Sequence, residues 1–233
     1  MDDLKILVGC HKPCECPDIV KKHKDIYIPI LAGAAESNIE PFWPGMIRDD
    51  IMDNISWLNP YYSEYTCLYW AWKNYDMIGN PEYFGFAQYH RFLNPDLFLN
   101  KLHPNKVYIY MINTCISVYD HYIVSESDKD KLKITSSILN DHFSDNFFDV
   151  FLCLDGYPAY TLFVAHRDVF YNLMEFLNVF IKAYCSHIDF DDKFYVRNCR
   201  YFAFMLERLT GYFFIHNYYH KTIELNPVNL ILT

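Results

Sequence analysis

The chain has 233 residues and a mass of 27.9 kDa, which predicts a single domain over residues 1–233. Twenty Lys and Arg against 29 Asp and Glu give a net charge of −9. This balance argues against a nucleic-acid partner, because phosphate neutralisation needs a basic face. Apolar residues make up 52% of the chain, too many for disorder. No run of 18 apolar residues occurs and the first residues are acidic, so we expect a cytoplasmic protein.

The N-terminal third contains two short β-prone runs and two loops. Residues 4–9 predict a buried strand, which is followed by a loop rich in Cys, Pro and charge over 11–24. Residues 26–31 predict a second strand, ended by Gly33. Residues 41–60 are dense in Pro, Gly, Asp and Asn and predict an unusually long loop.

The central third predicts a helix and then a strand with a polar end. Aromatic and apolar residues recur every three or four positions over 61–74, which indicates an amphipathic helix with an aromatic face. Asn59 is expected to cap it, with Pro60 at the first helical position. Residues 83–87 predict a buried strand that runs directly into the polar residues 88–91.

The C-terminal half alternates between strand and helix signals. We expect strands at 107–112, 150–154 and 161–165, a polar helix at 127–142, a turn at 155–158, and helices at 169–184 and 200–209. A Tyr- and His-rich tail follows. No internal repeat of fixed period occurs, so a mixed α/β layer fold is the predicted class.

Cysteine usage indicates free thiols. Of the eight Cys residues, most stand alone within apolar runs, as buried thiols do. Cys10, Cys14 and Cys16 with His11 are the alternative, a metal site, but a second ligand pair at zinc-finger spacing is missing.

Three polar segments are predicted to meet. They are the loop after the first strand, the helix start at 59–64, and the strand end at 88–91. The carboxyl ends of parallel strands share one edge of a sheet, so these segments could form one site. The sequence has no P-loop, G-x-G-x-x-G, G-x-S-x-G or H-E-x-x-H motif, which leaves dinucleotide redox chemistry, glycine-cradle phosphoryl transfer and triad hydrolysis without support.

Several stretches of these segments resemble a bacterial family of capsular or exopolysaccharide glycosyltransferases. They read DNIS at 53–56, NPYYSEYT at 59–66, LYWAWKN at 68–74 and YFGFAQYHRF at 83–92. The resemblance also takes in HKP at 11–13 and IPILAGA at 28–34, with weaker matches at 158–170 and at 207–209. The resemblance implies a single GT-A-like, Rossmann-like domain whose mixed, mostly parallel sheet is flanked by helices. It also implies transfer of a hexose from a UDP-sugar such as UDP-galactose to a growing surface polysaccharide or a lipid-linked glycan.

The resemblance assigns donor binding to ten residues: His11, Lys12, Asp53, Asn54, Asn59, Glu64, Gln88, Tyr89, His90 and Arg91. For each of them a helix cap, a core contact or a surface position is the alternative. The chain departs from the family where Gln88 replaces a more usual His and His90 replaces the first of two Arg. One fixed positive charge thereby becomes titratable near neutral pH.

The strand end at 88–91 carries no pair of carboxylates. Many GT-A enzymes hold a metal there with a D-x-D motif, whereas Arg91 and a protonated His90 could bind the leaving diphosphate directly. We therefore expect transfer with no metal and no other cofactor, beyond the UDP-sugar that serves as the donor substrate.

An inverting transfer needs a carboxylate base to take the proton of the acceptor hydroxyl. The candidates are Glu207 on a late predicted helix, favoured by analogy, and Asp155 at a predicted strand end. A structural ion pair is the alternative role for Glu207. Whether transfer inverts or retains configuration stays open.

Two wider alternatives remain. The same aromatic-rich cleft could bind a carbohydrate or nucleotide sugar without chemistry. The tail at 212–219 either packs against the sheet or contacts a membrane at the inner face of the cytoplasmic membrane, where lipid-linked acceptors lie.

Overall fold

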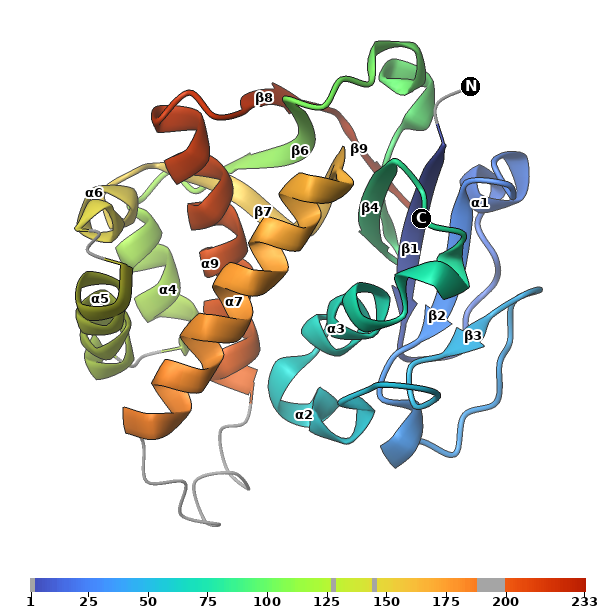
Figure 1. The fold of residues 1–233 in the computed structure, drawn as a ribbon, viewed down its shortest axis with the longest axis horizontal. Helices are drawn as coiled ribbons and strands as arrows, with labels where there is room; N and C mark the ends of the chain where they lie inside the picture. The colour runs from blue at the N-terminus through green and yellow to red at the C-terminus, as the bar shows by residue number, and fades with distance from the viewer. Residues whose placement is uncertain (1–2, 127–128, 144–145, 188–199) are drawn as a thin grey trace.

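The computed structural model describes residues 3–126, 129–143, 146–187 and 200–233. Within these described residues nine strands form one sheet, which confirms the mixed α/β class (Figure 1). The strands are β1 (Leu4–Cys10), β2 (Tyr27–Leu31), β3 (Ile47–Arg48), β4 (Tyr83–Gln88), β5 (Arg91–Leu93), β6 (Lys106–Asn113), β7 (Gly156–His166), β8 (Glu224–Pro227) and β9 (Leu230–Leu232).

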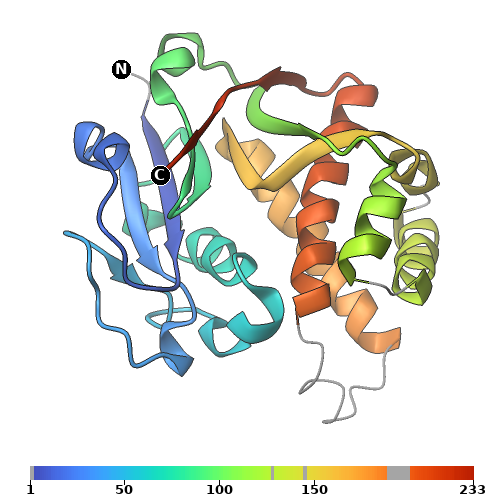
Figure 2. The ribbon, with the colours of Figure 1, turned by 180° about the vertical axis from the view of Figure 1, so that it is seen from behind.

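The sheet has the order β3-β2-β1-β4-β7-β6-β8 and is mostly parallel. Along this path only β7 runs against the others, since it pairs antiparallel with both β4 and β6. The hairpin strand β5 and the terminal β9 extend it beside β4. Figure 2 shows from behind how the chain end crosses from β8 back to the half that holds β1. The carboxyl ends of β1, β2 and β4 therefore lie along one edge.

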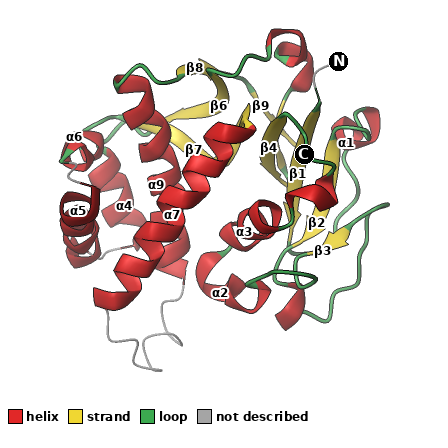
Figure 3. Ribbon diagram, viewed as in Figure 1, coloured by secondary structure: helices red, strands yellow, loops and turns green. Residues whose placement is uncertain are grey.

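Helices cover one face of this sheet (Figure 3). They are α2 (Asn59–Tyr62), α3 (Tyr65–Lys73), α4 (Val118–Glu126), α5 (Lys129–Phe143), α6 (Phe147–Leu152), α7 (Arg167–His187) and α9 (Arg200–Tyr219). Alternate side chains of the strands feed two cores: Leu7 and Phe84 pack under these helices, whereas Ile6 and Val8 pack under α1 (Asp18–Lys22) and the loops of the other face.

The predicted strand at 150–154 is wrong, because this stretch belongs to α6 and its end. Phe148, Phe151 and Leu152 are buried at helical spacing, and the first two rings stack on each other. Short apolar runs satisfy both the helix period and the strand period, so periodicity alone could not decide between helix and strand here. The predicted turn at 155–158 is also wrong: β7 begins at Gly156, where an added Cβ would lie 2.5 Å from the carbonyl oxygen of Ile112 on β6.

Three helix predictions need correction. The helix expected at 61–74 is two helices, because Ser63 takes φ 47° and breaks it. The polar helix expected from 127 corresponds to α5, and its first two positions lie outside the described residues. The helix expected at 200–209 extends to Tyr219, so the tail belongs to α9, which packs on β7 and buries Tyr212.

Candidate functional site

A cleft of about 530 Å³ opens at the carboxyl ends of β1, β2 and β4, where the sequence analysis expected a site. We call it the β1–β4 cleft. Its walls come from four segments: the end of β1, the turn after β2, the region of α2, and the end of β4. The lining residues are Gly9, His11, Ala32, Gly33, Glu36, Ser37, Asn59, Pro60, Ser63, Glu64, Gln88, Tyr89 and His90.

A buried carboxylate that sequence reasoning missed holds the β2 side of the cleft in place. Asp49 is fully buried and accepts hydrogen bonds from the N–H groups of Gly33 and Ala34, both at 2.9 Å. It also accepts from the hydroxyls of Ser56 and Thr66. Because these donors come from the turn after β2, from the segment before α2 and from α3, Asp49 joins the end of β2 to α3. Its Arg-Asp-Asp context within a long loop carries no motif that could have revealed this role.

Asn59 closes the same network and is not the helix cap that the sequence predicted. It is the first residue of α2, and its side-chain amide donates to the Ser63 carbonyl and to the Thr66 hydroxyl, both at 3.0 Å. The side chain lies against Gly33, where an added Cβ would come within 2.8 Å of it. Gly33 has φ 67°, which favours glycine on its own. Asn59, which the sequence analysis assigned to binding the sugar donor, thus shapes the floor of the cleft.

A chain of hydrogen bonds ties Arg91 to Glu64. The Arg91 Nη1 donates to Gln88 Oε1 at 2.6 Å, and Gln88 Nε2 donates to Glu64 Oε1 at 2.9 Å. The β4–β5 hairpin makes this possible, since Gln88 and Arg91 face each other across it. The Arg91 guanidinium also lies 4.1 Å from the ring centre of Tyr160. Glu64 and Gln88 line the cleft, and Arg91 is held directly beside it.

The remaining wall is an aromatic and cationic group after β1 and β4. The ring of His11 meets the Tyr89 ring edge-on at 5.0 Å, and the Lys12 ammonium lies 5.4 Å from the same ring. His90 stacks obliquely on Tyr89 at 4.4 Å. The loop after the first strand and the strand end at 88–91 therefore come together, as the sequence predicted.

The expected positive charge of His90 is not favoured at neutral pH. Partial burial lowers the pKa of His90 below its usual value, and the neighbouring Arg91, His11 and Lys12 lower it further. Its Nδ1 is buried, without a hydrogen-bond partner among the described residues. Lys12 and Arg91, which neighbour His90, carry fixed positive charges at this edge.

Glu207 lies behind the cleft, where α9 crosses β7. One oxygen of its carboxylate accepts from the Tyr160 N–H at 3.2 Å and from the Tyr157 hydroxyl at 3.3 Å. The Tyr160 N–H can reach Glu207 because the pairing of β7 with β6 shifts register at this point. Tyr160 and Thr161 both take positive φ there, at 61° and 57°. The break turns a ladder N–H toward the carboxylate.

Burial raises the pKa of Glu207, and the nearby Glu64 raises it further, while Arg208 and the two hydrogen bonds act in the opposite direction. Glu64 and Glu207 line one narrow crevice together with Tyr62, Tyr65, Leu68, Thr161, Ala203, Leu206 and Thr210. We call it the Glu207 crevice. Because Glu64 also lines the β1–β4 cleft, it connects the two.

Five predicted site residues line neither hollow: Lys12 and Arg91 lie beside the β1–β4 cleft, whereas Asp53, Asn54 and Asp155 have other surroundings. Asp53 is exposed and accepts from the Tyr69 hydroxyl at 3.4 Å, and its backbone exchanges hydrogen bonds with Asn74. Asn54 folds back onto its own loop, donating to the carbonyls of Asp50 and Met52. Asp155 is exposed before β7, where its carbonyl accepts from Thr114. We do not carry Asp53, Asn54 and Asp155 into the proposed site.

Cys10, Cys14 and Cys16 do not line the β1–β4 cleft. Cys10 is buried and its thiol contacts the Val8 carbonyl, and burial raises the pKa of the Cys14 and Cys16 thiols. Within the described residues, no three His, Cys, Asp or Glu side chains gather as metal ligands would. Metal-independent transfer stays a prediction.

The comparisons with known proteins match this architecture. A family model described as a domain of unknown function, DUF4422, matches residues 5–108, which include the β1–β4 cleft but not Glu207. No curated protein matches the chain. The chain is similar to the apo structure of WbbM, a bifunctional glycosyltransferase, with a TM-score of 0.81 and 20% identity. The alignment covers 100% of this chain and 45% of WbbM. At this identity the likeness establishes the fold alone, and the predicted mixed α/β fold with a mostly parallel sheet flanked by helices is confirmed.

None of the described helices combines the length and the apolar character that crossing a membrane requires.

Proposed function

We propose that this protein is a glycosyltransferase that moves a hexose from a UDP-sugar to a surface polysaccharide or a lipid-linked glycan. The single observation that carries the proposal is the β1–β4 cleft, in which a cationic and aromatic wall and a hydrogen-bonded Glu64 meet at the carboxyl edge of a parallel sheet. The fold shared with WbbM supports the reaction class. Galactose and inversion of configuration are the finer parts of the proposal.

The donor would lie with its diphosphate toward the two fixed cations. Lys12 stands over Tyr89 at one side of the cleft, and Arg91 is held at the other through Gln88. The guanidinium presents several N–H donors in a plane and can bind two phosphate oxygens at once. A diphosphate would therefore replace the Gln88 amide oxygen as the partner of Arg91. These contacts would stabilise the leaving group without a metal.

Glu207 is the proposed base. Its carboxylate would take the proton of an acceptor hydroxyl while the hydroxyl oxygen bonds to the anomeric carbon of the donor sugar. The bond from that carbon to the diphosphate oxygen breaks, and its electron pair leaves with the UDP. A raised pKa suits this role, because a base is most effective when its pKa lies near the working pH.

Donor binding can be tested by thermal shift with UDP-galactose, UDP-glucose and GDP-mannose. We expect a UDP-hexose to raise the melting temperature selectively, since ligands that bind only the folded state stabilise it. Arg91→Met should weaken binding of the UDP-hexose and leave uridine binding unchanged, because the lost contacts are to phosphate. Arg167→Met, at an exposed arginine on α7, is the matched control.

Two results would contradict the proposal. One is the absence of stabilisation by every nucleotide sugar, and the other is an equal loss of affinity in the Arg91 and Arg167 variants. Selective binding without any release of UDP would instead indicate a binding module.

A further inference from the structure

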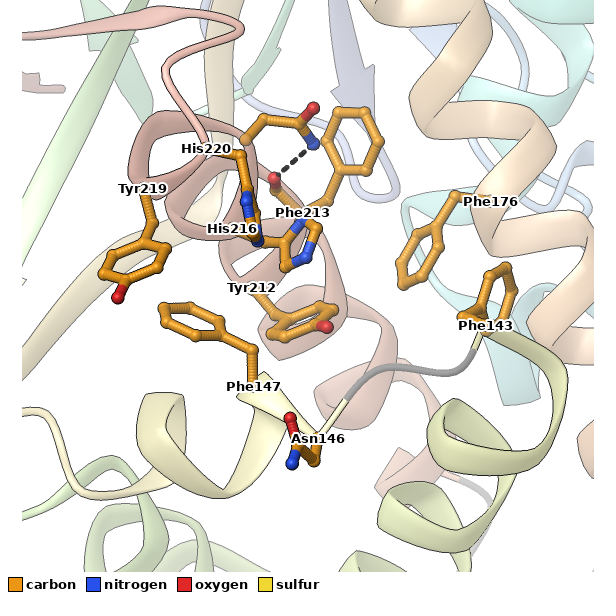
Figure 4. Close-up of a pocket in the computed structure, with 10 residues that line it drawn as sticks. Phe143, Asn146, Phe147, Phe176, Tyr212, Phe213, His216, Tyr219 and His220 are labelled. Atoms are coloured by element: carbon orange, nitrogen blue, oxygen red, sulfur yellow. Dashed lines mark hydrogen bonds between the residues drawn. The ribbon is translucent and has the colours of Figure 1, made fainter.

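A third hollow, of about 720 Å³, lies at the C-terminal end of α9, between α9, α6, α7 and the end of α5 (Figure 4). We call it the α9 pocket. Its lining residues are Phe143, Asn146, Phe147, Phe176, Tyr212, Phe213, His216, Asn217, Tyr219 and His220. His216 follows Glu207 by nine residues, about two and a half helical turns, so the two side chains leave opposite faces of α9. The α9 pocket is therefore separate from the Glu207 crevice.

Two sets of aromatic rings form its walls. Phe176 contacts Phe143 at 5.1 Å and Phe213 at 5.6 Å on one side. On the other side Phe147 contacts Tyr219 at 4.9 Å and His216 at 5.6 Å. Tyr212 lies between them, 6.0 Å from Phe176 and 6.4 Å from Phe147 (Figure 4). The pocket thus offers flat apolar ring surfaces on facing walls.

Polar atoms interrupt these rings. The imidazoles of His216 and His220 lie 4.4 Å apart with their planes tilted by 52°, and Asn146 and the exposed Tyr219 also line the pocket. Tyr212 is almost fully buried, with 2% of its surface exposed, and its hydroxyl has no hydrogen-bond partner within the described residues. A buried hydroxyl without a partner is costly, and a ligand that supplied one would recover that cost.

The lining contains aromatic rings, imidazoles, amides and hydroxyls but no Asp, Glu, Lys or Arg. This composition does not suit a charged ligand such as the nucleotide donor, whose phosphates need cations. A sugar ring matches it, because its C–H face packs on aromatic rings and its hydroxyls bond to imidazole, amide and phenol groups. The volume falls in the range of about 300–1,000 Å³ that is usual for ligand pockets.

We propose that the α9 pocket is a second, non-catalytic carbohydrate site that binds a neutral glycan. On the proposed function, that glycan is a distal part of the acceptor, held by one face of α9 while the opposite face carries Glu207. Such a site would favour long acceptors over short ones.

The experiment measures binding of neutral hexasaccharides from glucan, galactan and mannan by NMR saturation transfer and calorimetry. We expect at least one to bind, and Tyr219→Ala/His220→Ala to weaken it by about tenfold or more, because stacking and hydrogen bonds are both lost. Both side chains are exposed, so the fold should persist. Tyr218→Ala is the matched control, since Tyr218 is 54% exposed on the same turn but does not line the pocket.

The inference is overturned if no hexasaccharide binds or if the double variant binds as well as the Tyr218 control. Binding of phosphatidylglycerol vesicles that the double variant alone loses, without glycan binding, would also overturn it and indicate a membrane surface. UDP-hexose binding in the β1–β4 cleft is measured on the same proteins. If the wild type binds the UDP-hexose but no glycan, only this inference is refuted. If it binds a glycan but no UDP-hexose, only the proposed function is refuted.

Discussion

The carboxylates of Asp49 and Glu207 differ in how fully their oxygens are hydrogen-bonded. Asp49 is enclosed by two backbone N–H groups and two hydroxyls, which use both of its oxygens. Glu207 receives two longer hydrogen bonds on a single oxygen and faces a crevice shared with Glu64. A carboxylate with every lone pair used holds a fold together, whereas one left partly unsatisfied beside a hollow can still accept a proton.

The largest expected effect comes from removing the base. Glu207→Gln keeps the shape but not the proton-accepting charge, so UDP release from the donor in the presence of acceptor should fall by about 10² to 10⁴-fold. Donor affinity should not change, because Glu207 lies outside the β1–β4 cleft. Glu175→Gln, at an exposed position on α7, is the control. Turnover within a few-fold of wild type would remove Glu207 from the mechanism.

Asp49 should behave in the opposite way, through stability. Asp49→Ala leaves two N–H groups and two hydroxyls without their acceptor, so the free energy of unfolding should fall by about 2–4 kcal/mol. Urea denaturation measures this change, and Asp25→Asn on an exposed loop is the control. A loss below that of the control would show that the network does not hold the cleft.

Tyr157→Phe removes one of the two hydrogen bonds that the Glu207 carboxylate accepts. The Tyr157 hydroxyl donates to the carboxylate and so lowers the pKa of Glu207, against the burial that raises it. Without that bond the pKa rises further, and the acidic limb of the profile of kcat/KM against pH should move to higher pH. An acidic limb that stays in place, with reduced turnover, would indicate a purely structural role for Tyr157.

Ser63 is expected to give the smallest effect. Its backbone has φ 47° and ψ −127° at the break between α2 and α3, a conformation that favours glycine. Ser63→Gly should stabilise the protein by about 0.5 kcal/mol, because relief of strain slightly exceeds the added entropy of the unfolded chain. Thermal denaturation at constant pH checks the sign, and destabilisation would mean that the strain is not there.

The sequence predicted the parts of the fold that local pattern determines. The strands at β1, β2 and β4 and the polar ends that meet at one edge followed from short apolar runs and from the rule that parallel strands align their carboxyl ends. The prediction of a strand at 150–154 was wrong because the apolar residues of this stretch satisfy both the helix and the strand period.

The site residues that were missed depend on contacts between distant segments. Asp49 acts through Gly33, Ser56 and Thr66, which no local pattern links to it. Tyr160 acts through a break in β7 that depends on pairing with β6. Conversely, Asp53 and Asn54 have the residue types of a binding site, but Asp53 bonds to Tyr69 and Asn74 and Asn54 bonds to its own loop.

Metal-independent transfer with Glu207 as the base is tested by measuring UDP release from a UDP-hexose in excess EDTA, with the wild-type protein and with Glu207→Gln. We expect release by the wild type that EDTA does not abolish and that the variant lacks. Equal release by the two proteins, or none with any nucleotide sugar even after manganese is supplied, would contradict it.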